Sequence, residues 1–126
     1  MRTAVHPPSL DVSRPELWRV TDRASFQALR RGRRVRRGPL SVAYVPADPV
    51  AVPSPARVAF AVGTATGGAV VRNRVRRRLR AALRELVVEG RLPAGTYLVG
   101  ASAEVARTPW SELVSLLADA VDEVTR

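Results

Sequence analysis

The feature that most constrains the fold is a run from Val71 to Leu86 in which apolar and basic side chains recur at helical spacing. At 100° per residue, one stripe of this run is apolar and the opposite stripe is polar and basic. The apolar stripe holds Val71, Val75, Leu79, Ala82 and Leu86, and the polar stripe holds Asn73, Arg77, Arg80 and Arg84. The pattern predicts one amphipathic helix from Ala69 to Glu89, with an apolar face on a core and a cationic face toward a polyanion. Nucleic acid is the obvious polyanion.

Charge is unevenly distributed along the 126 residues, whose formal net charge is +10. All 21 basic residues are arginine, which binds phosphate through two parallel hydrogen bonds and stacks on bases. Residues 23–84 contain fifteen arginines against one acid, Asp48, whereas residues 85–126 contain three arginines against seven acids. This segregation indicates a basic working region backed by an acidic scaffold.

Composition excludes several classes of function. The chain has no cysteine, so disulfides, thiolate zinc sites and thiol nucleophiles are ruled out. No apolar run reaches the roughly 20 residues of a membrane span, and the first ten residues lack the apolar middle of a signal peptide, so we expect a cytoplasmic protein. His6 is the only histidine, and no carboxylate cluster is visible, so we expect a binding protein without catalytic residues of its own.

The order of local patterns predicts a single domain over residues 19–126, preceded by a flexible proline-containing arm over residues 1–18. A short helix is expected from Arg23 to Arg31, ended by Gly32 and burying Phe26 and Leu29. Strands are expected at 40–45, 57–62 and 96–101, and an edge strand at 32–37 would complete an antiparallel meander with the first two. The strand, helix, strand order after residue 57 predicts a parallel crossover. Thr108 is the expected cap of a final amphipathic helix, with Pro109 in its first turn.

Two stretches then point to a family. Residues 57–62 read RVAFAV, and residues 67–80 read GGAVVRNRVRRRLR. They resemble the signature of the protein subunit of bacterial ribonuclease P, approximately R-V-G-F-S-V-S-K-K-x-G-N-A-V-x-R-N-R-x-K-R-x-x-R, whose R-N-R-x-[KR]-R core is specific. The phenylalanine helix, the basic cluster, the late strand and the final helix also follow the family order.

The resemblance implies an α+β fold, an α-β-β-β-α-β-α sandwich with a four-stranded mixed sheet. Its crossover around the arginine-rich helix would be left-handed, where periodicity alone predicts a right-handed one. The resemblance also implies that a large RNA subunit is the catalyst, using Mg²⁺ bound mainly by RNA. The protein would help that RNA hold precursor tRNA while the 5′ leader is removed, without a membrane or a small-molecule substrate.

The resemblance also assigns roles to individual residues. The positions that match the RNA-binding helix of the family are Arg72, Asn73, Arg74, Arg76, Arg77 and Arg80. Phe26 matches an aromatic residue of the cleft that receives the leader. Tyr44, Arg30 and Phe60 are further cleft candidates, although Tyr44 and Phe60 are at least as well explained as core residues.

The chain departs from the family pattern at several positions. Gly63-Thr64-Ala65 replaces S-K-K, Gly68 replaces an asparagine and Ala59 replaces a glycine. Arg30 stands where a second cleft aromatic is expected, and the spacing to Gly32 is one residue short. Leader contact would then be weaker, or would be compensated by Arg30, Arg33 and Arg34.

A rival hypothesis is a structural RNA-binding protein of ribosomal type, which would use the same basic face without serving an enzyme. The combination of the R-N-R-x-R-R helix with an aromatic cleft discriminates between the two. DNA binding is a distant third hypothesis, since neither a helix-turn-helix nor a zinc-ligand spacing is present.

Overall fold

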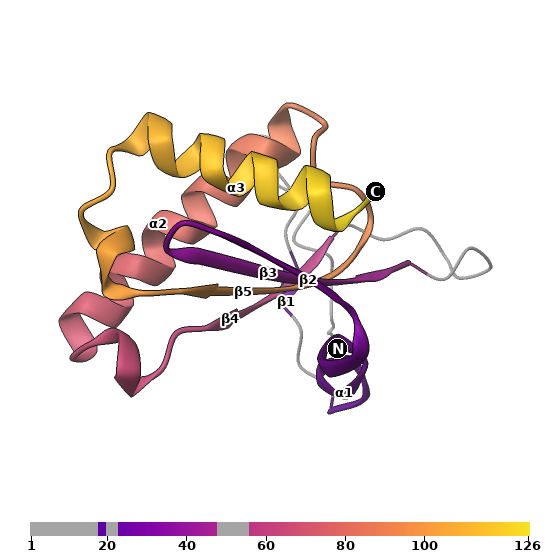
Figure 1. Cartoon of the computed structure of the whole chain (residues 1–126), viewed down its shortest axis with the longest axis horizontal. Coiled ribbons are helices and arrows are strands. Elements are labelled where there is room, and N and C mark those ends of the chain that lie inside the picture. The colour runs from indigo at the N-terminus through magenta and orange to yellow at the C-terminus, as the bar shows by residue number, and fades with distance from the viewer. Residues whose placement is uncertain (1–17, 20–22, 48–55) are drawn as a thin grey trace, which may run out of the picture.

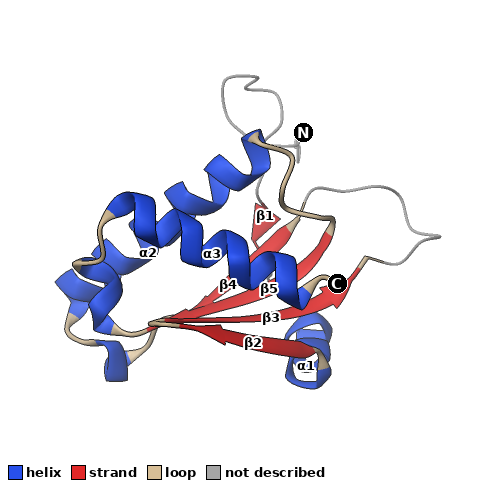
Figure 2. Ribbon diagram, turned by 45° about the horizontal axis from the view of Figure 1, so that its top comes forward, coloured by secondary structure: helices blue, strands red, loops and turns tan. Residues whose placement is uncertain are grey.

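The computed structural model describes residues 18–19, 23–47 and 56–126, which form a sheet between two layers of helices (Figures 1 and 2). The strands are β1 (Trp18–Arg19), β2 (Arg33–Arg37), β3 (Leu40–Pro46), β4 (Arg57–Ala61) and β5 (Gly95–Ala101). The helices are α1 (Arg23–Arg31), α2 (Ala69–Val88) and α3 (Trp110–Val124), with short 3-10 helices η2 (Thr64–Thr66) and η3 (Ala103–Ala106). α2 and α3 cover one face of the sheet, and α1 lies against the other (Figure 2).

The predicted order of helices and strands is confirmed, with one strand more than the expected four. The additional strand is β1, which pairs in parallel with β4 through Trp18 and Arg57. The rest of the predicted N-terminal arm lies outside the described residues. The crossover from β4 through α2 to β5 joins two parallel neighbours, as expected, and its hand stays a prediction of the resemblance.

The predicted meander is wrong, because β5 lies between β3 and β4. The strand order is β1-β4-β5-β3-β2, with β2 and β3 antiparallel, β3 and β5 antiparallel, and β4 and β5 parallel. Local alternation identifies a strand but carries no information about which strand will be its neighbour. The late strand takes the central place and is paired on both sides, with Tyr97 and Val99 fully buried on the face that α2 and α3 cover.

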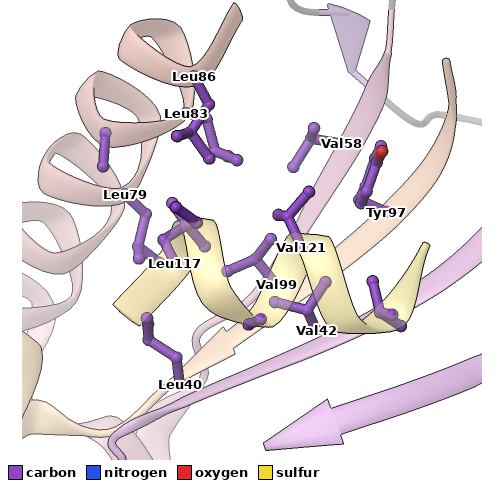
Figure 3. Close-up of a cluster of buried hydrophobic side chains, with 14 of the residues drawn as sticks. Leu40, Val42, Val58, Leu79, Leu83, Leu86, Tyr97, Val99, Leu117 and Val121 are labelled. Atoms are coloured by element: carbon purple, nitrogen blue, oxygen red, sulfur yellow. The ribbon is translucent and has the colours of Figure 1, made fainter. Parts of the chain in front are cut away.

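The main core lies between the sheet and the α2–α3 layer (Figure 3). β3, β4 and β5 contribute alternate residues to it, as the two-residue repeat of a strand requires, and β2 contributes Val35. α2 contributes the predicted apolar stripe, of which Val71 alone is only partly buried. The largest fully buried side chains include Leu40, Leu79, Leu83, Leu86, Tyr97, Leu113 and Leu117.

The expected cap of the last helix is wrong. α3 begins at Trp110, and Pro109 occupies the N-cap position with φ −54° and no side-chain hydrogen bond. The Thr108 hydroxyl instead donates to the carbonyl of Glu104 at 2.9 Å. Thr108 therefore closes the turn of η3, and the fixed φ of proline starts the helix.

Candidate nucleic-acid interface

α2 carries all six residues that were expected to contact RNA. It begins at Ala69 after Gly68, and no acidic residue lies in its first turn. Asn73, Arg74 and Arg77 are exposed, and Arg72, Arg76 and Arg80 are half-buried at the sides of the same helix. Helical spacing brings all six onto one continuous surface of about two turns. The full list is Arg72, Asn73, Arg74, Arg76, Arg77 and Arg80.

Arg74 and Arg77 are the most available cations of this surface. Neither makes an ion pair or a side-chain hydrogen bond with any residue in the described ranges. A guanidinium left in this state can still donate five hydrogen bonds. Both side chains are therefore suited to pairing with the phosphates of an incoming polyanion.

The side of α2 that faces β4 is held in place by two arginines. Arg76 donates from Nη2 to the carbonyl of Val62 at 2.8 Å, and from Nη1 to Asn73 Oδ1 at 3.3 Å. Arg80 lies over the ring of Phe60, with its Cζ atom 5.6 Å from the ring centroid. Phe60 thus supports a member of the basic surface and lies on the same sheet face as α2.

Arg78 is directed to the opposite side of α2 and is used within the protein. Its guanidinium donates to the carbonyls of Val105 and Thr108, the second at 2.6 Å, and lies over the ring of Trp110. Arg78 therefore ties α2 to the start of α3. In the sequence, only helical spacing distinguishes Arg78 from the neighbouring arginines. At 100° per residue, Arg78 lies 140° from Asn73 around the helix.

α1 brings Phe26 and Arg30 together on the other face of the sheet. The two side chains are one helical turn apart and line one surface hollow with Arg23 and Gln27. Burial of Phe26 was expected, but its side chain is 40% exposed, whereas Leu29 is fully buried. A helix lying on one sheet face buries only a narrow stripe, and Leu29 occupies that stripe.

Tyr44 is not brought to the same place as Phe26. Its side chain points into the main core, where its ring centroid is 4.9 Å from that of Tyr97, and its hydroxyl donates to the carbonyl of Ala94 at 3.0 Å. Burial raises the pKa of Tyr44. The next residue in each direction along β3, Ala43 and Val45, faces α1 instead, because side chains alternate along a strand. Of the four cleft candidates, only Phe26 and Arg30 therefore share a surface.

Two arginines of β2 complete the charge on the α1 side. Val35 is buried in the main core, so Arg34 and Arg36 project from the opposite face of the sheet, and both are exposed. Arg33 projects toward α3, where its Nη1 donates to the carbonyl of Arg126 at 2.5 Å. Strand alternation in the sequence would have assigned Arg36, rather than Arg33, as the companion of Arg34.

The face of the sheet on the α1 side carries small side chains. Ser41, Ala61 and Gly100 line an open hollow together with Arg36. A Cβ atom at Gly100 would lie 2.6 Å from the Ser41 hydroxyl, so the face has no room for a larger residue there. An exposed arginine, Arg36, thus stands at the edge of this hollow.

The described ranges contain no group of three or more histidine, cysteine, aspartate or glutamate side chains that could hold a metal ion. Among the helices of the same ranges, none has the length and apolar character that crossing a membrane requires.

Comparison with known proteins gives one consistent result. A family model described as Ribonuclease P matches residues 15–125. The ribonuclease P protein component of Thermobifida fusca is 49% identical over 114 residues, which cover 86% of this chain and 76% of the relative. The component of Bartonella quintana is 37% identical over 113 residues, which cover 86% of this chain and 84% of the relative.

Solved structures with the same fold include two RNase P proteins. The protein of Staphylococcus aureus superposes with a TM-score of 0.67 at 20% identity, covering 86% of this chain and 95% of that chain. The protein of Thermotoga maritima superposes with a TM-score of 0.69 at 18% identity, covering 84% and 96%. The arrangement of helices and strands described above is therefore similar to theirs over most of both chains.

Proposed function

The chain belongs to the ribonuclease P protein family, and on this premise we propose that it is the subunit that binds the catalytic RNA and the 5′ leader of precursor tRNA. The holoenzyme would be an endoribonuclease that removes the leader and leaves the mature 5′ end of the tRNA. The polypeptide would supply binding and orientation, and the RNA subunit would supply the reaction.

The observation that carries this function is the exposed basic surface of α2. Arg74 and Arg77 are cations without partners in the described ranges, and the exposed Asn73 directly precedes Arg74 on the helix. Each arginine that neutralises a phosphate releases counterions from the RNA, which gives both affinity and a strong dependence on salt. The α2 surface is therefore assigned to the catalytic RNA.

The α1 side of the sheet is assigned to the leader. A single-stranded segment binds well to an aromatic ring that stacks on a base and to cations that follow its backbone. Phe26 offers the exposed ring, Arg30 lies one turn away, and Arg34 and Arg36 project from the same side of the sheet. Arg30, Arg34 and Arg36 would compensate for the missing second aromatic.

Magnesium is assigned mainly to the RNA. A hard divalent cation prefers several oxygen ligands, carboxylates above all. The described residues do not bring such a set together, and the exposed part of α2 is cationic. In the site that we propose, arginine side chains of the protein bind phosphates directly. We place the protein in the cytoplasm with its RNA partners.

A binding measurement with two substrates tests the leader assignment. The holoenzyme should bind precursor tRNA more tightly than mature tRNA. Phe26→Ala should reduce this difference in affinity by about fivefold or more, since base stacking contributes roughly 1–3 kcal/mol. Phe26→Leu is the control for apolar bulk without a ring face, and it should also lose most of the difference. An unchanged difference in both variants would contradict the assignment.

Crosslinking separates the enzyme subunit from a structural RNA-binding protein of ribosomal type. A photoreactive group at position 26 should crosslink to the leader of precursor tRNA in the holoenzyme. The ribosomal alternative predicts no contact with a leader at that position.

A further inference from the structure

Arg76 connects the sheet to an exposed polar side chain of α2, that of Asn73. Its Nη2 donates to the carbonyl of Val62, which follows β4 directly, at 2.8 Å. Its Nη1 donates to Asn73 Oδ1 one helical turn earlier, at 3.3 Å. Arg76 is half-buried and Asn73 is exposed. The guanidinium is thus fixed by backbone at one end and can fix the Asn73 amide at the other.

The contact determines which way the amide of Asn73 faces. A guanidinium has only donors, so the Asn73 atom that meets Arg76 must be the carbonyl oxygen. The amide nitrogen Nδ2 is then turned away from Arg76, and no residue in the described ranges accepts a hydrogen bond from it. Asn73 therefore presents two donors outward and has its acceptor already engaged.

We propose that Arg76 is a positioning residue, which holds Asn73 so that Nδ2 donates to a hydrogen-bond acceptor of the bound RNA. The acceptor is a phosphate oxygen or an acceptor on a base edge. This inference rests on the proposed function, because it specifies how the α2 surface recognises its RNA. Asn73 then selects for acceptors, whereas Arg74 and Arg77 select only for negative charge.

Replacement of the amide by a carboxylate tests the orientation of Asn73. Asn73→Asp keeps the shape and can still pair with Arg76, but it replaces two donors with an acceptor. Affinity for the ribonuclease P RNA of the same organism should fall by about tenfold or more, and further than in Asn73→Ala. The Asn73→Asp variant should still bind the RNA more weakly than wild type at high salt, where repulsion between its carboxylate and the phosphates is screened. Affinity equal to wild type or higher would show that the oxygen of Asn73 faces the RNA, and would overturn the proposal.

A double-mutant cycle tests whether Arg76 acts through Asn73. Arg76→Lys keeps the charge, so a residue that merely neutralised a phosphate would tolerate it. We expect Arg76→Lys to weaken binding by about fivefold, and to weaken it little more when Asn73 is already alanine. The matched control is Arg77→Lys, whose own effect on binding, whatever its size, should be additive with that of Asn73→Ala. Additive effects of Arg76→Lys and Asn73→Ala would overturn the positioning role.

Two further measurements complete the test. Phosphorothioate and 7-deazapurine interference on the RNA should each be compared between wild type and Asn73→Ala. A signal lost in the variant identifies a phosphate or a base acceptor, and the absence of any lost signal contradicts the proposal.

Denaturant unfolding shows whether the variants are folded. If wild-type protein did not bind this RNA, the proposed function itself would fail, which is a different outcome from an additive cycle.

Discussion

Arg77 and Arg78 are neighbours in sequence with opposite surroundings. Arg77 is exposed and has no partner in the described ranges. Arg78 instead donates hydrogen bonds to the carbonyls of Val105 and Thr108, which precede α3. Arg77→Ala should weaken RNA binding and lower the slope of log affinity against log salt by about one unit, with unchanged unfolding. Titrations of the RNA at several salt concentrations provide the measurement.

Arg78→Ala is the matched comparison on the same helix. Its removal leaves the carbonyls of Val105 and Thr108 without their donor, and we expect the free energy of unfolding to fall by about 1–2 kcal/mol. Urea unfolding measures this loss. A stable Arg78→Ala variant with a strongly reduced salt slope would show that Arg78 binds RNA after all.

The two tyrosines make stability depend on alkaline pH. Burial, and secondly the charge of Tyr44, raises the pKa of Tyr97, and burial also raises the pKa of Tyr44. An unfolded tyrosine loses its proton near pH 10 while the folded one keeps it, so the unfolded state binds fewer protons. Stability is therefore complete below about pH 10 and falls above it, by at most about 1.4 kcal/mol per pH unit for each tyrosine.

Urea unfolding at a series of pH values checks this dependence. The chain has neither lysine nor cysteine, and arginine stays protonated, so few other groups titrate in this range. Tyr97→Phe should flatten the decline more than Tyr44→Phe does. An equal decline in Tyr97→Phe and wild type would contradict the assignment.

At the residue scale, sequence predicted the members of the α2 surface but not their separate roles. The exposure of Phe26 depends on how α1 lies on the sheet. The burial of Tyr44 depends on the α2–α3 layer, which covers the opposite face. The bond from Arg76 to Val62 joins residues fourteen positions apart. No local pattern predicts such a contact.

At the scale of elements, the helices and strands followed their local patterns, whereas one of the predicted strand pairings, that of β3 with β4, was wrong. α2 was predicted as Ala69 to Glu89 and runs from Ala69 to Val88. The position of β5 between β3 and β4 depends on long-range pairing, which the alternation within each strand does not encode. The same pairing places Ser41, Ala61 and Gly100 side by side on the α1 side of the sheet.

Gly95 tests the packing of β5 against β3. It has φ +144°, and a Cβ atom there would lie 2.5 Å from Tyr44 Cε1 and 2.7 Å from the carbonyl oxygen of Val45. Gly95→Ala should lower the free energy of unfolding by about 2 kcal/mol or more, as measured with urea. Gly63→Ala is the control, because no atom lies within 4 Å of its Cβ position, and it should stay within about 0.5 kcal/mol of wild type. Equal stability of the two variants would contradict the described packing.

At the scale of the whole molecule, basic and acidic side chains are concentrated on different elements. Arg74 and Arg77 on α2, and Arg30, Arg34 and Arg36 on the α1 side, are exposed. Two acids of α3 instead pair within the protein, Glu123 with Arg37 and Asp122 with Arg91, the latter at 3.0 Å. The acidic scaffold inferred from sequence thus includes α3, and the five exposed arginines named above form no ion pair with its acids in the described ranges.

The central claim is that this protein assists an RNA catalyst in removing the 5′ leader. The most direct test is the rate of leader removal by the cognate ribonuclease P RNA at a Mg²⁺ concentration where the RNA alone is slow. Addition of the protein should raise this rate, and Arg77→Ala should raise it less at equal protein concentration. If the wild-type protein gave no stimulation at any concentration, the claim would be wrong.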